Sequence, residues 1–244
     1  MKVTVLGIGL MGYPMARRLA QAGFEVHAWN RTLAKAQRLT SHGVHVHALA
    51  PDAVRQANIV LTMLDDGAAV EQVLFDGEVA AAMARDSMVV DMSSIRPIEA
   101  RDHAARLSEL HIDYLDAPVS GGTIGAEAGT LAIMVGGKAS VFDRALPFLQ
   151  ALGHPKHVGP TGAGQLAKLA NQMIVGATIG VVAEALLLCE RGGANMAKVR
   201  EAITGGFADS RILQVHGQRM VDRDFVPRGR MSVQLKDLRN ALAT

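Results

Sequence analysis

The sequence predicts an α/β protein in which a doubly wound parallel sheet is followed by an all-α segment. Three observations lead to this prediction. Short apolar segments alternate with helical patterns over the first 160 residues, a glycine-rich loop joins the first strand to the first helix, and a long helical pattern follows the last strand. Apolar strands that alternate with helices are typical of a parallel sheet covered on both faces. We therefore expect two domains, residues 1–160 and 161–244.

The elements of the first domain are expected in regular order. Buried strands are predicted at residues 3–6, 25–29, 44–47, 59–64, 89–92, 114–117 and 131–135, and helices at 15–22, 32–42 and 51–57. Gly23 and Gly43 directly follow the first two helical patterns, as helix-ending glycines do. After a breaker at 160–164, a helical pattern runs to about Arg191, and Gly192–Gly193 ends it.

The composition excludes several classes of protein. The 244 residues carry a formal net charge of +2, and Lys and Arg are scattered, whereas nucleic-acid binding needs a basic face. The one cysteine, Cys189, permits no intrachain disulfide, which is usual in a reducing compartment. The N-terminus lacks the apolar core of a signal peptide, and the apolar run 169–183 is too short and too polar for a membrane span. We expect a soluble, cytoplasmic protein that binds neither nucleic acid nor membrane.

The loop after the first predicted strand has the pattern G-x-G-x-x-G over Gly7–Gly12. It follows a strand and opens a helix, which is the context of a dinucleotide-binding fingerprint. In that motif Gly7 permits the tight turn, Gly9 lets the backbone approach a pyrophosphate, and Gly12 lets the helix pack on the strand. The helix N-terminus supplies the anion site. The sequence therefore predicts a Rossmann-type domain in which Gly7, Gly9, Leu10, Met11 and Gly12 contact the cofactor.

The end of the second predicted strand indicates which cofactor binds. NAD sites usually place Asp or Glu there, on the ribose hydroxyls. Here the sequence reads Asn30-Arg31-Thr32, without an acid. Arg31, assisted by Asn30 and Thr32, can pair with a 2′-phosphate, so we predict NADP as cofactor, with NADPH preferred over NADH.

Two later strand ends carry polar loops. Ser120-Gly121-Gly122 offers a hydroxyl and consecutive unhindered N–H groups, which suit a carboxylate, although such loops are also common without a ligand. Ser94, after strand 89–92, is expected near the nicotinamide ribose. Leu64, at the end of strand 59–64, is expected to border the cofactor.

Lys168 lies about one turn into the long helical pattern. Asn171 and Gln172 follow three and four residues later, so the three side chains share one helix face. A partly desolvated lysine near a helix N-terminus should have a lowered pKa, which suits general acid–base catalysis. The pattern equally permits a lysine that extends from the helix into solvent.

Six ordered motifs resemble the β-hydroxyacid dehydrogenase family. They are GIGLMG, WNRT, DMSS, DAPVSGGTIGAEAGTLAIMVGG, GAGQLAKLANQ and the late KDL. The KLANQ segment resembles the branch of 2-hydroxy-3-oxopropionate (tartronate semialdehyde) reductases, whereas WNRT resembles the glyoxylate/succinic semialdehyde reductases. A 3-hydroxyisobutyrate dehydrogenase is a third alternative, so the substrate stays open among small carboxylated aldehydes and 2-keto acids.

The resemblance implies a role for several residues. It implies acid–base catalysis by Lys168 without a metal, binding of the substrate carboxylate by Ser120, Gly121 and Gly122, cofactor contacts for Ser94 and Lys236, and dimerisation through the helical domain. We expect Asn171 and Gln172 to bind the remaining substrate oxygens. Gln172 departs from the asparagine of many members. Relatives also continue beyond the KDL segment, so a shortened helical domain is expected.

Three other readings compete with a reductase of these substrates. A decarboxylating sugar-phosphate dehydrogenase would need a larger helical domain and a phosphate site, and the sequence shows no basic cluster for one. An imine reductase of similar architecture usually lacks the lysine, which argues against it here. A cofactor-binding scaffold without turnover would keep the glycine fingerprint alone, and cofactor binding without turnover would identify it. His42, His45 and His47 are close in sequence, but no acid or cysteine joins them, so no metal site is predicted.

Overall fold

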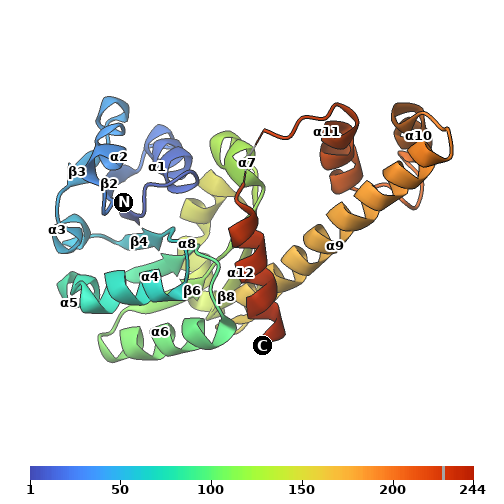
Figure 1. Ribbon diagram of the computed structural model, residues 1–244. Coiled ribbons are helices and arrows are strands. Elements are labelled where there is room, and N and C mark those ends of the chain that lie inside the picture. Colours follow the sequence, from blue (N-terminus) through green and yellow to red (C-terminus); the bar gives the residue numbers. More distant parts are fainter. Residues whose placement is uncertain (227–228) are drawn as a thin grey trace. The chain divides into compact units, whose positions relative to one another are not determined.

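The computed structural model describes residues 1–226 and 229–244. These residues divide into two compact units, Met1–Lys168 with Ala243–Thr244, and Leu169–Leu242. The first unit contains the sheet and the second is helical (Figure 1). The division falls within a helix, eight residues beyond the boundary expected from the sequence.

The sheet of the first unit has nine strands. They are β1 (Lys2–Leu6), β2 (Glu25–Trp29), β3 (His45–His47), β4 (Ile59–Thr62), β5 (Met88–Asp91), β6 (Asp113–Asp116), β7 (Val119–Ser120), β8 (Leu131–Gly137) and β9 (Gly153–Gly159). The order β3-β2-β1-β4-β5-β6 is parallel throughout, and β8 then pairs antiparallel with β6 and β7. This is the 3-2-1-4-5-6 order of a dinucleotide-binding sheet, which confirms the predicted fold class.

Helices cover both faces of this sheet. They are α1 (Gly12–Gln21), α2 (Leu33–Gln37), η1 (Thr40–His42), α3 (Ala50–Val54), α4 (Gly67–Glu71), η2 (Gln72–Asp76), α5 (Val79–Ala82), α6 (Pro97–Glu109), α7 (Gly122–Ala128) and α8 (Ala139–Leu152). One core packs α1 and α8 on the sheet, with Leu19 and Phe148 fully buried. The other packs α3, α4 and α6 on the opposite face, with Val54 and Leu107 fully buried. Alternate strand residues point to opposite faces, so each apolar strand feeds both cores.

The predicted helix 32–42 was wrong as a continuous element. The structure has α2 over Leu33–Gln37 and then the separate 3₁₀ turn η1. Thr40 Oγ1 donates to the Gln37 carbonyl at 2.8 Å and Ser41 Oγ to the Arg38 carbonyl at 3.3 Å. Hydroxyl groups that bond the nearby backbone compete with helical hydrogen bonding, which accounts for the break.

The helical unit consists of the greater part of α9 (Ala163–Arg191), α10 (Met196–Ile203), η3 (Leu213–Gly217), α11 (Gln218–Val221) and α12 (Met231–Leu242). Its small core contains Val182, Leu186 and Leu213. Within the described part of the chain, α9 alone is long and apolar enough to cross a membrane, with a mean hydropathy of 1.9 in its most apolar stretch. The prediction that the run 169–183 is too short to span a membrane was wrong about length, because this run is part of a 29-residue helix. One such helix is weak evidence for a membrane span, since core helices have the same composition.

Candidate active site

Hydrogen bonds join the loops at the carboxyl edge of the sheet. The Ile8 N–H donates to Asn30 Oδ1 at 2.9 Å, which links the loops after β1 and β2. The Leu64 N–H donates to Ser93 Oγ at 3.0 Å, which links the loops after β4 and β5. Ligands of open parallel sheets bind beyond this edge, where the strand order reverses. The predicted cofactor residues of the first unit are therefore brought to one edge.

The three glycines of the fingerprint differ in whether the protein leaves room for a side chain at their positions. Gly7 has a φ of 102°, and a Cβ there would overlap the Met63 carbonyl group. A Cβ on Gly12 would overlap the Gly7 carbonyl oxygen, so α1 begins directly against the turn. A Cβ on Gly9, by contrast, would meet no heavy atom of the described residues within 4 Å, its chain neighbours aside. The protein itself requires Gly7 and Gly12, whereas Gly9 faces open space.

The N-terminus of α1 suits an anion. Met11 stands at the N-cap position, and the first turn of this fully described helix has neither a capping side chain nor an acidic residue. The Tyr13 N–H donates to the Gly9 carbonyl at 3.1 Å and Pro14 has no N–H, so Gly12 supplies the N–H group of this turn that is open to an anion. Leu10 beside it is 71% exposed, and Met11 packs against the core. These residues fit the pyrophosphate of a dinucleotide.

After the end of β2, the Asn30 side chain is hydrogen-bonded within the loop, whereas the Arg31 side chain is exposed. Asn30 accepts the Ile8 N–H and donates from Nδ2 to the Thr32 carbonyl at 2.9 Å, so its carboxamide shapes the loop. Arg31 and Thr32 are exposed, and within the described residues Arg31 has no hydrogen-bond or ion-pair partner. The guanidinium is thus available to an anionic group.

The two serines after β5 also differ. Ser93 is fully buried, and its hydroxyl serves the loop after β4 through Leu64. Its backbone N–H donates to Asp91 Oδ1 at 3.0 Å. Ser94 is half-buried in the next position. The structure therefore uses Ser93 to hold the loop from which Ser94 extends.

The predicted carboxylate clamp lies at a strand-to-helix turn. Ser120 ends β7, and α7 begins at Gly122. Gly121 and Gly122 have φ values of 135° and 61°, which side chains rarely adopt. Both glycines are exposed, and Ser120 is half-buried. Their N–H groups are accordingly unhindered by side chains of their own.

Lys168 lies in the second turn of α9 with only 9% of the residue exposed. The first turn of α9 is pressed onto the sheet, because a Cβ on Gly164 would overlap the carbonyl oxygens of Asp116 and Met134. Of the two alternatives that the spacing permits, the lysine that extends into bulk solvent does not fit this burial. Its burial supports a lysine with a specific role.

Two residues that hold this turn were missed in the sequence. Asp116 and Gln165 are both fully buried. Asp116 accepts the N–H of Gly162 at 2.8 Å and that of Gln165 at 2.9 Å. The Gln165 carboxamide accepts the Ile95 N–H at 3.1 Å and donates to the Ser93 carbonyl at 2.9 Å. An acid that ends an apolar strand was the one available signal, and the partner of such an acid cannot be read from sequence.

Burial raises the pKa of Asp116 to about 6. The two backbone N–H bonds oppose this shift, and the carboxylate of Asp91 adds to it by charge repulsion. Asp91 is fully buried on the neighbouring strand, and it accepts hydrogen bonds from Thr62 Oγ1 at 2.7 Å and Tyr114 Oη at 3.2 Å. Burial likewise raises the pKa of Asp91. Two acids thus lie beneath the strand ends in a low-dielectric environment.

In the helical unit, Gln172 is engaged within the protein. Its Nε2 donates to Asp237 Oδ2 at 2.7 Å and to Gln234 Oε1 at 3.1 Å, which ties α9 to α12. Asn171 Nδ2 donates to Gln172 Oε1 at 2.9 Å, and Lys236 Nζ lies 3.4 Å from Asp237 Oδ1. The substrate contacts of Asn171 and Gln172 and the cofactor contact of Lys236 stay predictions.

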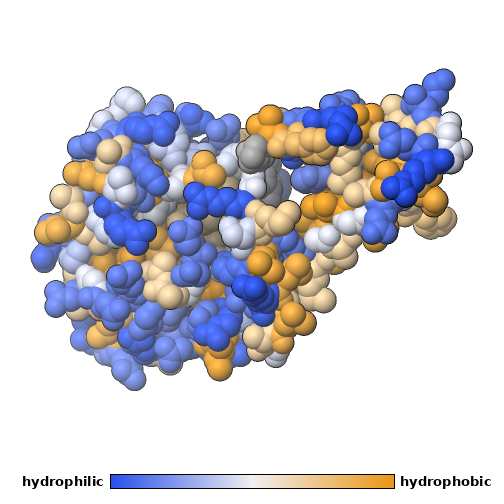
Figure 2. All heavy atoms as spheres, viewed as in Figure 1, coloured by the Kyte–Doolittle hydropathy of each residue, from blue (hydrophilic) through white to orange (hydrophobic). Residues whose placement is uncertain are grey.

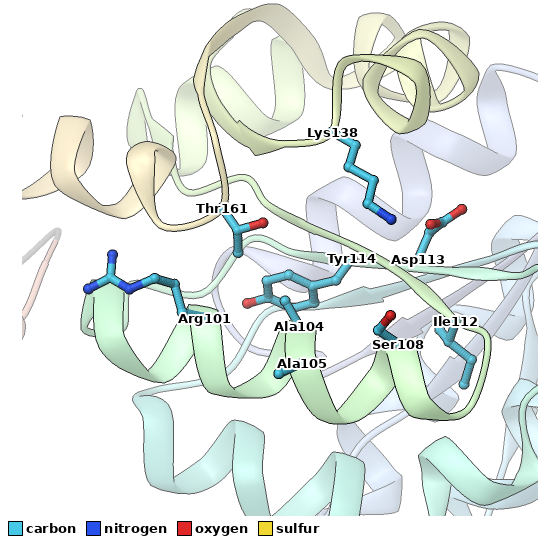
Figure 3. A pocket seen from close by; sticks show the side chains of 9 residues that line it. All are labelled: Arg101, Ala104, Ala105, Ser108, Ile112, Asp113, Tyr114, Lys138 and Thr161. Carbon is cyan, nitrogen blue, oxygen red and sulfur yellow. The ribbon is translucent and has the colours of Figure 1, made fainter.

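A cavity of about 230 Å³ lies elsewhere, between α6, β6 and the segment before α8. Figure 3 shows Arg101, Ser108, Tyr114, Lys138 and Thr161 among its lining residues. None of the predicted site residues lines it, so we do not assign the chemistry to this cavity.

The histidines near β3 form a cluster with β2. His27 Nδ1 lies 2.7 Å from His47 Nε2, and the rings of His27 and His45 are stacked with centroids 4.9 Å apart. Among residues 1–226 and 229–244, no group of three or more His, Cys, Asp or Glu side chains is placed to hold a metal ion. The cluster is a feature of the sheet edge.

Two family models match the chain. The model described as the NAD binding domain of 6-phosphogluconate dehydrogenase matches residues 2–173. The model described as NAD-binding of NADP-dependent 3-hydroxyisobutyrate dehydrogenase matches residues 162–244. Together they cover both units.

Known proteins resemble the chain over nearly its whole length. It is 45% identical to 2-hydroxy-3-oxopropionate reductase of Escherichia coli K12, over 99% of this chain and 83% of the relative. The structure of Mycobacterium tuberculosis 3-hydroxyisobutyrate dehydrogenase with L-serine superposes with a TM-score of 0.91 at 34% identity, covering 99% and 85% of the two chains. The structure of Psf3 in complex with NADP+ and 2-OPP gives 0.90 at 25% identity, covering 99% and 86%.

Proposed function

The chain belongs to the β-hydroxyacid dehydrogenase family, and from that premise we propose that it is an NADPH-dependent reductase of small carboxylated aldehydes or 2-keto acids. Members of the family are NAD(P)-dependent oxidoreductases that act on a CH–OH group. The substrate we favour is 2-hydroxy-3-oxopropionate, because the reductase of that name in Escherichia coli is 45% identical over 99% of this chain.

The observation that carries the proposal is the placement of Lys168. This lysine is 9% exposed, on a helix whose first turn is bonded to the ends of β5 and β6. The same sheet edge carries the glycine loop that suits a pyrophosphate. A buried ammonium beside a dinucleotide site is suited to general acid–base catalysis.

Each group of the chain then has a task. Gly7–Gly12, Asn30–Thr32, Leu64 and Ser94 would hold the cofactor, which when bound supplies the hydride to the carbonyl carbon. Ser120 and the N–H groups of Gly121 and Gly122 hold the substrate carboxylate. We expect Asn171 and Gln172 to bind its remaining oxygens. Lys168 Nζ gives a proton to the carbonyl oxygen as the C–H bond forms, and it accepts that proton in the oxidative direction.

The preference for NADPH rests on the end of β2. No acid stands at residues 30–32 to accept bonds from ribose hydroxyls, and Arg31 is exposed without a partner in the described residues. A guanidinium pairs well with phosphate. Arg31 therefore favours the cofactor that carries a 2′-phosphate.

A homo-oligomer through the helical unit completes the proposal. Figure 2 shows apolar side chains gathered along α9. Ile174, Val181 and Leu188 of this helix are each about two-thirds exposed or more. Apolar surface of this kind is usually covered by a partner, and a second copy is the partner we propose. We place the protein in the cytoplasm, where one unpaired cysteine is usual.

Initial rates test the function. We would measure NADPH and NADH oxidation with tartronate semialdehyde, succinic semialdehyde, methylmalonate semialdehyde and glyoxylate. Lys168→Ala should lower kcat by several orders of magnitude while NADPH still binds, and the exposed Lys156→Ala serves as the matched control. The best aldehyde identifies the branch, including the 3-hydroxyisobutyrate and glyoxylate/succinic semialdehyde alternatives. A Lys168→Ala variant with native turnover would exclude lysine catalysis, and wild-type protein that binds NADPH without turnover would be a scaffold.

A further inference from the structure

The first turn of α9 receives its capping group from another element. The opening N–H groups of a helix have no intrahelical acceptor, and a side chain close in sequence usually supplies one. Here Asp116, at the end of β6, accepts the N–H of Gly162 on one carboxylate oxygen and that of Gln165 on the other. Lys168 follows one turn later on the same helix.

The surrounding contacts leave this turn little freedom. A Cβ on Gly164 would overlap the carbonyl oxygens of Asp116 and Met134, and a Cβ on Gly136 would lie 2.6 Å from Asp116 Oδ1. The Gln165 carboxamide adds bonds to the Ile95 N–H and the Ser93 carbonyl. The start of α9 is thereby bonded to the two strand ends from which the loops of Ser94 and Ser120 extend.

We propose that Asp116 is a positioning residue of the reaction, which fixes Lys168 against these loops by holding the first turn of α9 through both of its carboxylate oxygens. The inference rests on the proposed role of Lys168 and adds a residue that acts on it through the helix. A buried carboxylate is a costly cap, because its ionised form is desolvated. It alone among side chains of this size offers an acceptor on both branches, since an asparagine carries a donor on one.

If Asp116 positions Lys168, protonation of its carboxylate should lower kcat, and this pH dependence can be measured. Protonation places a hydrogen on one carboxylate oxygen and weakens one of the two bonds. With the pKa of Asp116 raised by burial to about 6, this happens close to neutral pH. The ionisable groups that interact with it electrostatically are Asp91 on β5 and the Tyr114 hydroxyl on its own strand, and Arg101 of α6 lies beside Gly162.

Asp116→Asn is the test, because the amide keeps the shape and loses one acceptor. We expect kcat to fall about 100-fold, the order associated with a displacement of about 1 Å in an active site. The Kd and KM of NADPH should stay within twofold. The acid limb of the wild-type kcat profile, with an apparent pKa between about 5 and 7, should disappear. Asp113→Asn, on the same strand and bonded to Arg144 at 2.6 Å instead, is the matched control and should behave as wild type.

Two results would overturn the inference. One is an Asp116→Asn enzyme with native kcat and an unchanged acid limb. The other needs no variant and covers the case in which Asp116→Asn does not fold: a wild-type kcat that shows no titration between about pH 5 and 7. Lys168→Ala separates this failure from that of the proposed function. If Lys168→Ala is inactive and Asp116→Asn is native-like, only the positioning role is lost; if Lys168→Ala turns over normally, the catalytic role of the lysine is lost first.

Discussion

The fingerprint glycines permit one substitution that should weaken cofactor binding without affecting folding, and another that should lower stability. A methyl group at Gly9 meets open space, and the φ of Gly9 is not positive, so Gly9→Ala should fold as wild type or gain a few tenths of a kcal/mol from the unfolded state. The same methyl stands where a pyrophosphate would approach the backbone. We expect the Kd of NADPH to rise on the order of 100-fold, which is about 2.7 kcal/mol.

Gly12→Ala should behave in the opposite way. Its Cβ would overlap the Gly7 carbonyl oxygen, which is main chain and cannot rotate away. Overpacking of this kind costs about 1–3 kcal/mol, and for a chain of this size each kcal/mol lowers Tm by about 2–4 °C. We therefore expect Tm to fall by about 2–12 °C.

Thermal unfolding and fluorescence titration with NADPH measure both effects. Gly180→Ala on α9 is the matched control, since its Cβ also meets nothing in the described residues within 4 Å; it should bind NADPH normally. A Gly9→Ala protein that binds NADPH within twofold of wild type would refute the assignment of this loop to the cofactor. A Gly12→Ala protein with native Tm would refute the packing argument.

Three further outcomes are expected. Arg31→Ala should raise the KM for NADPH about 10- to 100-fold and that for NADH less than threefold, because only NADPH carries the 2′-phosphate; equal effects on both cofactors would contradict this. Burial lowers the pKa of His27 and His47, so the native state binds fewer protons than the unfolded state, and stability should fall as pH drops below about 6.5. A His27→Gln protein should lose less Tm between pH 7.5 and 5.5 than wild type, and an identical loss would exclude the histidine pair as the cause. Gln172→Leu removes a donor to the buried Asp237 and should lower the Tm of the helical unit by about 2–8 °C, whereas native melting would show that the bond to α12 is dispensable.

Most of the fold could be predicted from signals that lie within short stretches of the sequence. Apolar strands such as 59–62 and the glycine loop after β1 are encoded in contiguous residues, so the order of the sheet follows from a known pattern. The helix over 32–42 failed where hydroxyl groups compete with the backbone, a balance that depends on side-chain rotamers. Lys168 was predicted as the acid–base residue from its spacing to Asn171 and Gln172 and from the resemblance to the β-hydroxyacid dehydrogenase family.

The contacts that hold the candidate site in place could not be predicted from the sequence. Asp116 lies 46 residues before Gly162 and 49 before Gln165, to which it bonds. Only the paired geometry of β6 and α9 brings the acid to the helix. The engagement of Gln172 with Asp237, 65 residues apart, is equally tertiary. The sequence pattern predicts the candidate reacting group Lys168, whereas the groups that hold its helix are found only in the structure.

Lys168 is the last residue of the nucleotide-binding unit before Leu169 begins the helical unit. The proposed acid–base group thus belongs to the unit that contains the predicted cofactor loops, whereas Asn171, Gln172 and Lys236 belong to the helical unit. Under the proposed function, substitutions in the helical unit would alter substrate binding while the proposed proton donor keeps its anchorage on β6. Under the proposed function, such a division would separate the residues that bind the variable part of the substrate from those that hold its carboxylate and donate the proton, so the helical unit would be the first place to redesign specificity.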